Sequence, residues 1–139
     1  VEQLREKGEI TDGELMDNYV TFMASVFRSV RFGAGDAHGR ANMLRFNYFM
    51  QAGALARDAS TGPYRVDPEK MHKAIADLSG LILRLQGDGD LEGVKALMAK
   101  EGSIRPELQK DLDRLKGARI PVDVVFEQGS EQLGLNAPR

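Results

Sequence analysis

The apolar residues of 36–57, placed at the 100° per residue of an α-helix, predict a helix with two apolar sides. The first apolar stripe consists of Ala41, Leu44, Tyr48, Ala52 and Leu55, and the second of Met43, Phe46, Met50 and Gly53. The two polar strips between them are His38-Asn42-Arg45 and Arg40-Asn47-Gln51. A helix with two apolar sides packs against neighbours on both sides. One polar strip can then face water, whereas the other needs hydrogen-bonding partners or a cleft.

Further helices are expected on both sides of this segment. Amphipathic patterns predict them at residues 15–31, 67–87 and 90–100, and from residue 106 onward. The spacing of Thr11 and Glu14 is that of a capping box, and Asp67 suits an N-cap. The chain is therefore expected to be mainly α, with about five helices in a compact, bundle-like lobe.

Two short stretches have extended character. Residues 64–66 follow a turn signal, and the β-branched residues of 120–126 predict one strand. A lone strand is only marginally stable. We therefore expect the strand to pair with residues 64–66, with another molecule, or with sequence outside this chain.

Length, composition and net charge limit the class of protein that this chain can be. The chain has 139 residues, 42% of them apolar and 29% charged, which fits a single helical domain over 1–139. A net charge of −2 implies no general attraction to nucleic acid or to an acidic membrane. There is no cysteine, no apolar run of membrane-spanning length and no apolar signal-peptide core at the charged start. We expect a cytoplasmic protein without a nucleic-acid or membrane partner.

Gly33, Gly35 and Gly39 invite comparison with a dinucleotide-binding loop. The third glycine of that motif would stand at His38, and the segment before it is helical rather than a strand. A turn between two helices, with Gly33 and Gly35 at positive φ, is the favoured interpretation.

Asp88, Asp90, Glu92 and Gly93 resemble the start of a calcium-binding loop. The bidentate carboxylate that such a loop needs at its twelfth position is replaced by Ala99. A helix end followed by an acidic N-cap explains these residues better. His72 is interpreted as a surface residue, and the chain has no histidine spacing suited to an ordinary zinc site, so no metal ligands are assigned.

His38 is the strongest candidate for a functional residue. Asp36 suits the N-cap of its helix, and Asn42 and Arg45 follow His38 at i+4 and i+7 on one face. Together an imidazole, a carboxamide and a guanidinium can bind a peptide carbonyl or carboxylate. The alternative is a histidine that fills a turn and contacts only protein.

Several phrases resemble dipeptidyl peptidase III, a family of zinc peptidases, and its bacterial and plant relatives most closely. They are AHGRANM at 37–43 running into QAG at 51–53, RFG at 31–33, GPYRVD at 62–67 and IPVDVVFEQG at 120–129. The resemblance covers essentially the whole chain. It implies two lobes around a cleft, with zinc held in a mainly helical lobe by an HExxxH-type motif and an EExxA(E/D) motif. Neither motif occurs here, so both are expected upstream of Val1.

The resemblance implies that this chain is the C-terminal helical part of a larger peptidase, without zinc of its own and inactive alone. In the family, the histidine matching His38 helps to bind the peptide substrate and to stabilise the developing oxyanion. Arg40, Asn42 and Arg45 are the accompanying candidates for substrate binding. Well-studied members have arginine where this chain has Asn42, so one cation that could hold a substrate carboxylate is missing.

A second hypothesis comes from a different class. The two-sided helix and an unpaired strand would also suit a helical protein-interaction module without catalysis. In either case the partners expected are proteins: the missing N-terminal portion, or a second copy that covers exposed apolar faces.

Overall fold

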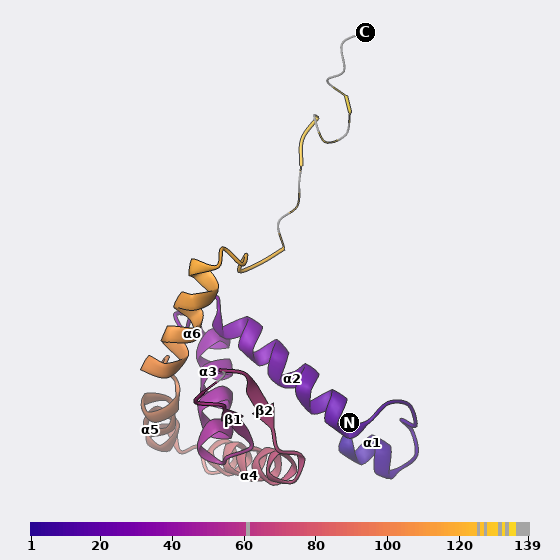
Figure 1. The fold of residues 1–139 in the computed structure, drawn as a ribbon. Coiled ribbons are helices and arrows are strands. Elements are labelled where there is room, and N and C mark those ends of the chain that lie inside the picture. Colours follow the sequence, from indigo (N-terminus) through magenta and orange to yellow (C-terminus); the bar gives the residue numbers. More distant parts are fainter. Residues whose placement is uncertain (61, 125, 127, 131, 133, 136–139) are drawn as a thin grey trace. The chain divides into compact units, whose positions relative to one another are not determined.

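The computed structural model describes residues 1–60, 62–124, 126, 128–130, 132, 134 and 135. Its elements are α1 (Glu2–Glu6), α2 (Leu15–Val30), α3 (Ala37–Gln51), β1 (Leu55–Arg57), β2 (Tyr64–Val66), α4 (Pro68–Gly87), α5 (Leu91–Glu101) and α6 (Pro106–Gly117) (Figure 1). The chain divides into two compact units, Val1–Arg105 and Pro106–Arg139. The first unit contains every residue considered as a functional candidate. The mainly helical fold predicted from the sequence is confirmed.

Helix α3 is the centre of the first unit. It contacts α2 and α5 most extensively, and also α4 and β1. Met43, Leu44 and Phe46, from the two apolar stripes, are each at most 6% exposed, and so is Phe49, which belongs to neither stripe. Helices α2 and α4 contribute the core residues Tyr19, Met23, Val26, Val30, Met71, Ala74 and Leu78. The prediction of a helix packed on two sides is confirmed.

Aspartate N-caps start three of these helices. The side chains of Asp36, Asp67 and Asp90 accept hydrogen bonds from the backbone N–H groups three residues later. These caps satisfy N–H groups that have no partner within the helix. The expected Thr11…Glu14 box is wrong by one turn, because Glu14 is itself the N-cap of α2 and pairs with Asp17.

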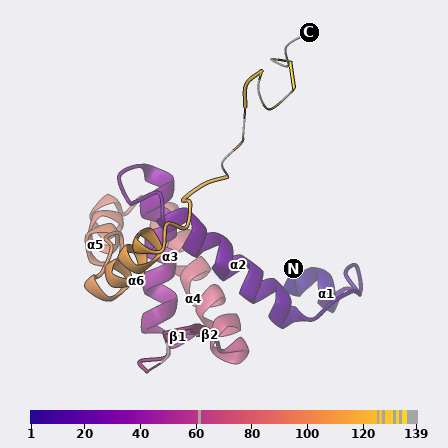
Figure 2. The same ribbon diagram turned by 45° about the horizontal axis from the view of Figure 1, so that its top comes forward.

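The expected helix at 36–57 is too long at its C-terminal end. Helix α3 stops at Gln51, and Gly53 with φ +68° reverses the chain direction. Residues 55–57 then form β1, which pairs antiparallel with β2, with Leu55 opposite Val66. The hairpin contacts α3 through β1 and α2 through β2 (Figure 2). The ring of Tyr64 lies 5.7 Å from Phe27 and 5.6 Å from Phe46, centroid to centroid, and anchors the hairpin.

The strand expected at 120–126 does not form among the residues described there, which are 120–124 and 126; Val125 lies outside the described residues. The segment 64–66, one of its three possible partners, is already paired with 55–57. The short α1 was not expected. No helix in the described part of the chain is long and apolar enough to cross a membrane.

Candidate functional site

The turn before α3 brings two glycines into close approach. Gly33 has φ +95°, and a Cβ placed on Gly39 would lie only 2.2 Å from the Gly33 carbonyl oxygen. Asp36 accepts from the Gly39 N–H at 2.7 Å. Residues 33–39 therefore form a tight helix–turn–helix connection rather than a phosphate cradle, as the sequence predicted. The expectation of a positive φ is confirmed for Gly33 and wrong for Gly35. His38 lies exposed in the first turn of the helix that follows this connection.

Asn42 and Arg45 lie together, one turn and two turns beyond His38. The Asn42 Nδ2 group donates to Ser29 Oγ of α2 at 2.7 Å, and Arg45 Nη1 donates to Asn42 Oδ1 at 2.8 Å. Asn42 thus connects the end of α2 to an exposed guanidinium on α3. The sequence placed Asn42 and Arg45 on one face, but it did not identify Ser29 as their partner.

Arg40 and His38 are exposed, and neither makes a hydrogen bond or ion pair within the described part of the chain. Arg40 lies two positions from both His38 and Asn42, about 200° around the helix from each. The structure therefore groups Asn42 with Arg45 and leaves Arg40 on a separate face.

The second polar strip of α3, Arg40-Asn47-Gln51, makes hydrogen bonds to residues at and after the end of α5 through Asn47 and Gln51. Asn47 is 1% exposed and donates to the backbone carbonyls of Glu101 at 2.7 Å and Ser103 at 2.9 Å. Gln51 donates to both carboxylate oxygens of Glu101 at 2.6 Å, and Arg105 donates to the same carboxylate at 2.7 Å. This strip joins α3 to the end of α5. The sequence predicted that one of the two polar strips needs partners but not which one, and in the structure the buried Asn47 belongs to this strip.

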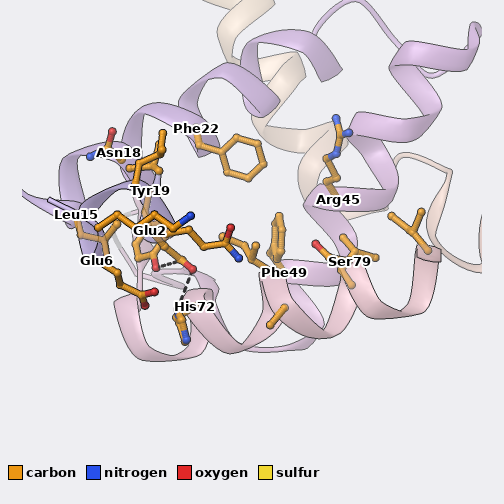
Figure 3. Close-up of a pocket in the computed structure, with 18 residues that line it drawn as sticks. Glu2, Glu6, Leu15, Asn18, Tyr19, Phe22, Arg45, Phe49, His72 and Ser79 are labelled. Carbon is orange, nitrogen blue, oxygen red and sulfur yellow. Dashed lines mark hydrogen bonds and ion pairs between the residues drawn. The ribbon is translucent and has the colours of Figure 1, made fainter. Parts of the chain in front are cut away.

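A pocket of about 820 Å³ lies between α1, α2, α3 and α4 (Figure 3). Arg45 and Phe49 of α3, Phe22 and Tyr19 of α2, Glu2 of α1 and His72 of α4 are among its lining residues. The rings of Phe22 and Phe49 meet edge to face with centroids 6.1 Å apart. We call this the Arg45 pocket.

Glu2 links three helices at one end of the Arg45 pocket. Its carboxylate accepts from the Tyr19 hydroxyl and lies 3.0 Å from His72 Nδ1, whose side chain is 60% exposed (Figure 3). Burial raises the pKa of Tyr19 above its usual range, and the hydrogen bond to Glu2 and its negative charge raise it further. His72 is a surface residue, as predicted, but its link to Glu2 was missed. No periodic pattern connects positions so far apart in the chain.

No group of three or more metal-binding side chains occurs among the described residues. At the proposed calcium-like loop, Asp90 caps α5 through the Gly93 N–H and Glu92 pairs with Lys95. The capping interpretation of that loop accounts for these contacts.

Comparison with known proteins identifies the fold. No family model matches the chain. The solved dipeptidyl-peptidase III of Corallococcus sp. strain EGB superposes with a TM-score of 0.81 at 37% sequence identity, covering 89% of this chain and 22% of that one. The DPP III of Caldithrix abyssi gives a TM-score of 0.82 at 30% identity, covering 96% of this chain and 25% of that one.

A curated protein is also similar. Nudix hydrolase 3 of Arabidopsis thaliana is 37% identical over 119 residues, which is 85% of this chain and 15% of that protein. This chain therefore spans about a quarter or less of the relatives that it matches. The name of the plant protein refers to the whole molecule, and the stretch that matches this chain is 15% of it.

Over most of its own length, the chain is therefore similar in fold and sequence to a helical segment of solved dipeptidyl-peptidase III structures.

Proposed function

We propose that this chain is the C-terminal helical portion of a dipeptidyl peptidase III-like, zinc-dependent peptidase and contributes His38 to the substrate side of its cleft. The observation that carries the proposal is the superposition on two such enzymes at 37% and 30% identity. The chain covers 22% and 25% of those structures, which supports a larger parent protein.

The described residues do not fit a zinc ion, because they include no cluster of three or more suitable ligands. Zinc therefore belongs to other parts of the proposed parent, and no step through the metal is assigned to this chain. The 139-residue chain alone is expected to be inactive as a peptidase.

His38 suits a hydrogen-bond donor to a substrate carbonyl. It is exposed in the first turn of α3, and the Asp36 cap and the packing of α3 against its neighbours fix the backbone that carries it. A donor held in place stabilises negative charge that develops on a carbonyl oxygen without having to reorganise. Asn42, Arg45 and Arg40 are the proposed substrate-binding companions.

The test uses the product of the complete reading frame that contains this chain. His38→Ala is expected to lower kcat/KM for peptide hydrolysis by about 10²- to 10³-fold, the usual loss when one such donor is removed. Zinc content and fold should be unchanged. Lys95→Ala, an exposed substitution on α5, is the matched control and should retain wild-type kinetics. Wild-type kinetics in the His38 variant would contradict the proposed role.

The alternative function is a helical interaction module without catalysis. It is favoured by apolar side chains left exposed in the described structure, such as Val20 at 48% and Leu83 at 67%. Sedimentation of the purified chain separates the two. Self-association over the micromolar range, together with no peptidase activity in the complete reading-frame product, would support the alternative.

A further inference from the structure

A second concave surface, of about 550 Å³, lies between α2 and the β1–β2 hairpin. We call it the hairpin groove. Its floor consists of the buried Met23, Phe46 and Leu55. Its other lining residues are the exposed Met16, Val20, Ala24 and Arg65 and the half-buried Phe27, Tyr64 and Val66.

Met16, Val20 and Ala24 form an exposed stripe along α2. They recur every four residues, so they lie on one side of the helix. Met16 is 37% and Val20 48% exposed, whereas Met23, which faces the core, is 4% exposed. Helix α2 is therefore apolar on a second side, and a helix with two apolar sides packs against neighbours on both.

The hairpin groove contains one charged residue, Arg65, among its lining residues. The side chain of Arg65 is exposed and makes no hydrogen bond or ion pair within the part of the chain that the structure describes. An acidic group is the complementary partner for this guanidinium, because a carboxylate accepts from two of its N–H groups at once.

The length of the matched enzymes points to the source of a partner. This chain covers 22% and 25% of the two solved structures, so most of a protein of that kind lies outside residues 1–139. A segment of the same polypeptide is already tethered to the groove. It therefore loses less translational freedom on docking than a separate molecule does.

We propose that the hairpin groove is the docking site of an apolar segment of the same polypeptide, outside residues 1–139, with an acidic side chain opposite Arg65. Its apolar side chains lie against Met16 and Val20 and remove them from water. Its carboxylate pairs with Arg65 and fixes the register of docking. The source of this segment rests on the proposed function, in which the chain is part of a larger peptidase.

The experiment uses the absence of cysteine from this chain, so that an introduced thiol reports its own position. Val20→Cys places the thiol in the groove. Ser25→Cys is the matched control, because Ser25 is an exposed residue of α2 that does not line the groove. Each variant is made in the 139-residue chain and in the complete reading-frame product. Reaction with iodoacetamide under native conditions is followed by peptide mass spectrometry.

We expect the Val20→Cys thiol to react at least about tenfold more slowly in the complete product than in the isolated chain, because the docked segment must open first. The Ser25→Cys thiol should react at similar rates in both. Arg65→Glu, combined with Val20→Cys in the complete product, repels the acidic side chain and should restore most of the reactivity. Lys95→Glu reverses a charge of α5 outside the groove and should leave the protection unchanged.

Equal reactivity of the Val20→Cys thiol in the isolated chain and in the complete product would overturn the proposal. So would protection in the complete product that Arg65→Glu leaves unchanged. Protection in the isolated chain that rises with its concentration would mean that a second copy occupies the groove, which also overturns the proposal. Labelling involves no hydrolysis. Its failure is therefore distinguishable from failure of the proposed peptidase function, which is tested by His38→Ala kinetics.

Discussion

The α-carbon of Gly39 faces the carbonyl oxygen of Gly33 so closely that a Cβ on Gly39 would lie 2.2 Å from that oxygen. The contact joins the residues after α2 to the first turn of α3, in which His38 lies. Because the obstructing atom belongs to the backbone, no side-chain rotation can relieve a clash at this place.

Gly39→Ala is therefore expected to destabilise the chain by about 1–3 kcal/mol, the usual cost of forcing extra atoms into a packed site. Urea unfolding followed by circular dichroism measures the loss. Gly35→Ala is the matched control: a Cβ on Gly35 meets no atom within 4 Å, and its φ is not positive. Equal stability of the two variants would show that the 33–39 turn opens freely.

The buried amide of Asn47 provides a second prediction. Asn47→Ala removes the donor to two carbonyls, those of Glu101 and Ser103, and leaves them without this bond. A loss of about 1–3 kcal/mol is expected, because an unsatisfied buried polar group costs its desolvation free energy. Asn47→Asp should destabilise further, since a carboxylate cannot donate and would face carbonyl oxygens.

Chemical denaturation of both Asn47 variants measures these losses. The control is Gln109→Ala, which removes an exposed side-chain bond to Asp113 and should change stability by no more than about 0.5 kcal/mol. If Asn47→Ala is as stable as this control, water satisfies the carbonyls of Glu101 and Ser103 with no loss of folding free energy, which contradicts the prediction.

The elements that could be predicted from sequence are those with several periods of pattern. The two apolar stripes repeat over several turns of α3, and Asp36, Asp67 and Asp90 each act locally as N-caps. Periodicity also predicted that one of the two polar strips of α3 needs partners, but it did not show which one.

Short elements and contacts between distant positions could not be predicted in this way. The segment 64–66 was predicted to be extended from the turn signal before it and forms β2, whereas its partner 55–57 was expected to be helical. A strand of three residues is too short for its alternation to be recognised. Asn42 meets Ser29 across thirteen positions and two helices. Neither residue indicates the other in the sequence. The role of His38 stays a prediction, because it depends on a substrate rather than on the fold.

A third prediction concerns zinc. The described residues hold no group of metal ligands, so the melting temperature of the 139-residue chain should be the same in zinc as in chelator. A ligand that binds only the folded state would raise it by mass action. Peptidase assays of the same samples should show no zinc-dependent activity. A rise in melting temperature of several degrees, reversed by chelator, would reveal a site that this chain builds itself.

The last prediction concerns Tyr19 and alkaline pH. Because burial, the bond to Glu2 and the charge of Glu2 all raise the pKa of Tyr19, the folded chain holds this proton more tightly than the unfolded chain. The resulting stability is fully present below the ordinary tyrosine pKa of about 10 and is lost as pH rises above that value. Wild-type chain should therefore lose stability more steeply in this range than Tyr19→Phe.

Phenolate absorbance, compared between wild type and Tyr19→Phe, isolates the ionisation of Tyr19. The ionisation of Tyr19 should occur only at a pH above the usual range for tyrosine. Glu2→Gln should lower the pKa of Tyr19 only part of the way, because burial, the leading cause of the shift, is unchanged in that variant. Tyr48→Phe, as control, should leave the Tyr19 transition in place. A Tyr19 transition near pH 10 in the folded chain would contradict both the burial of the Tyr19 hydroxyl and its hydrogen bond to Glu2.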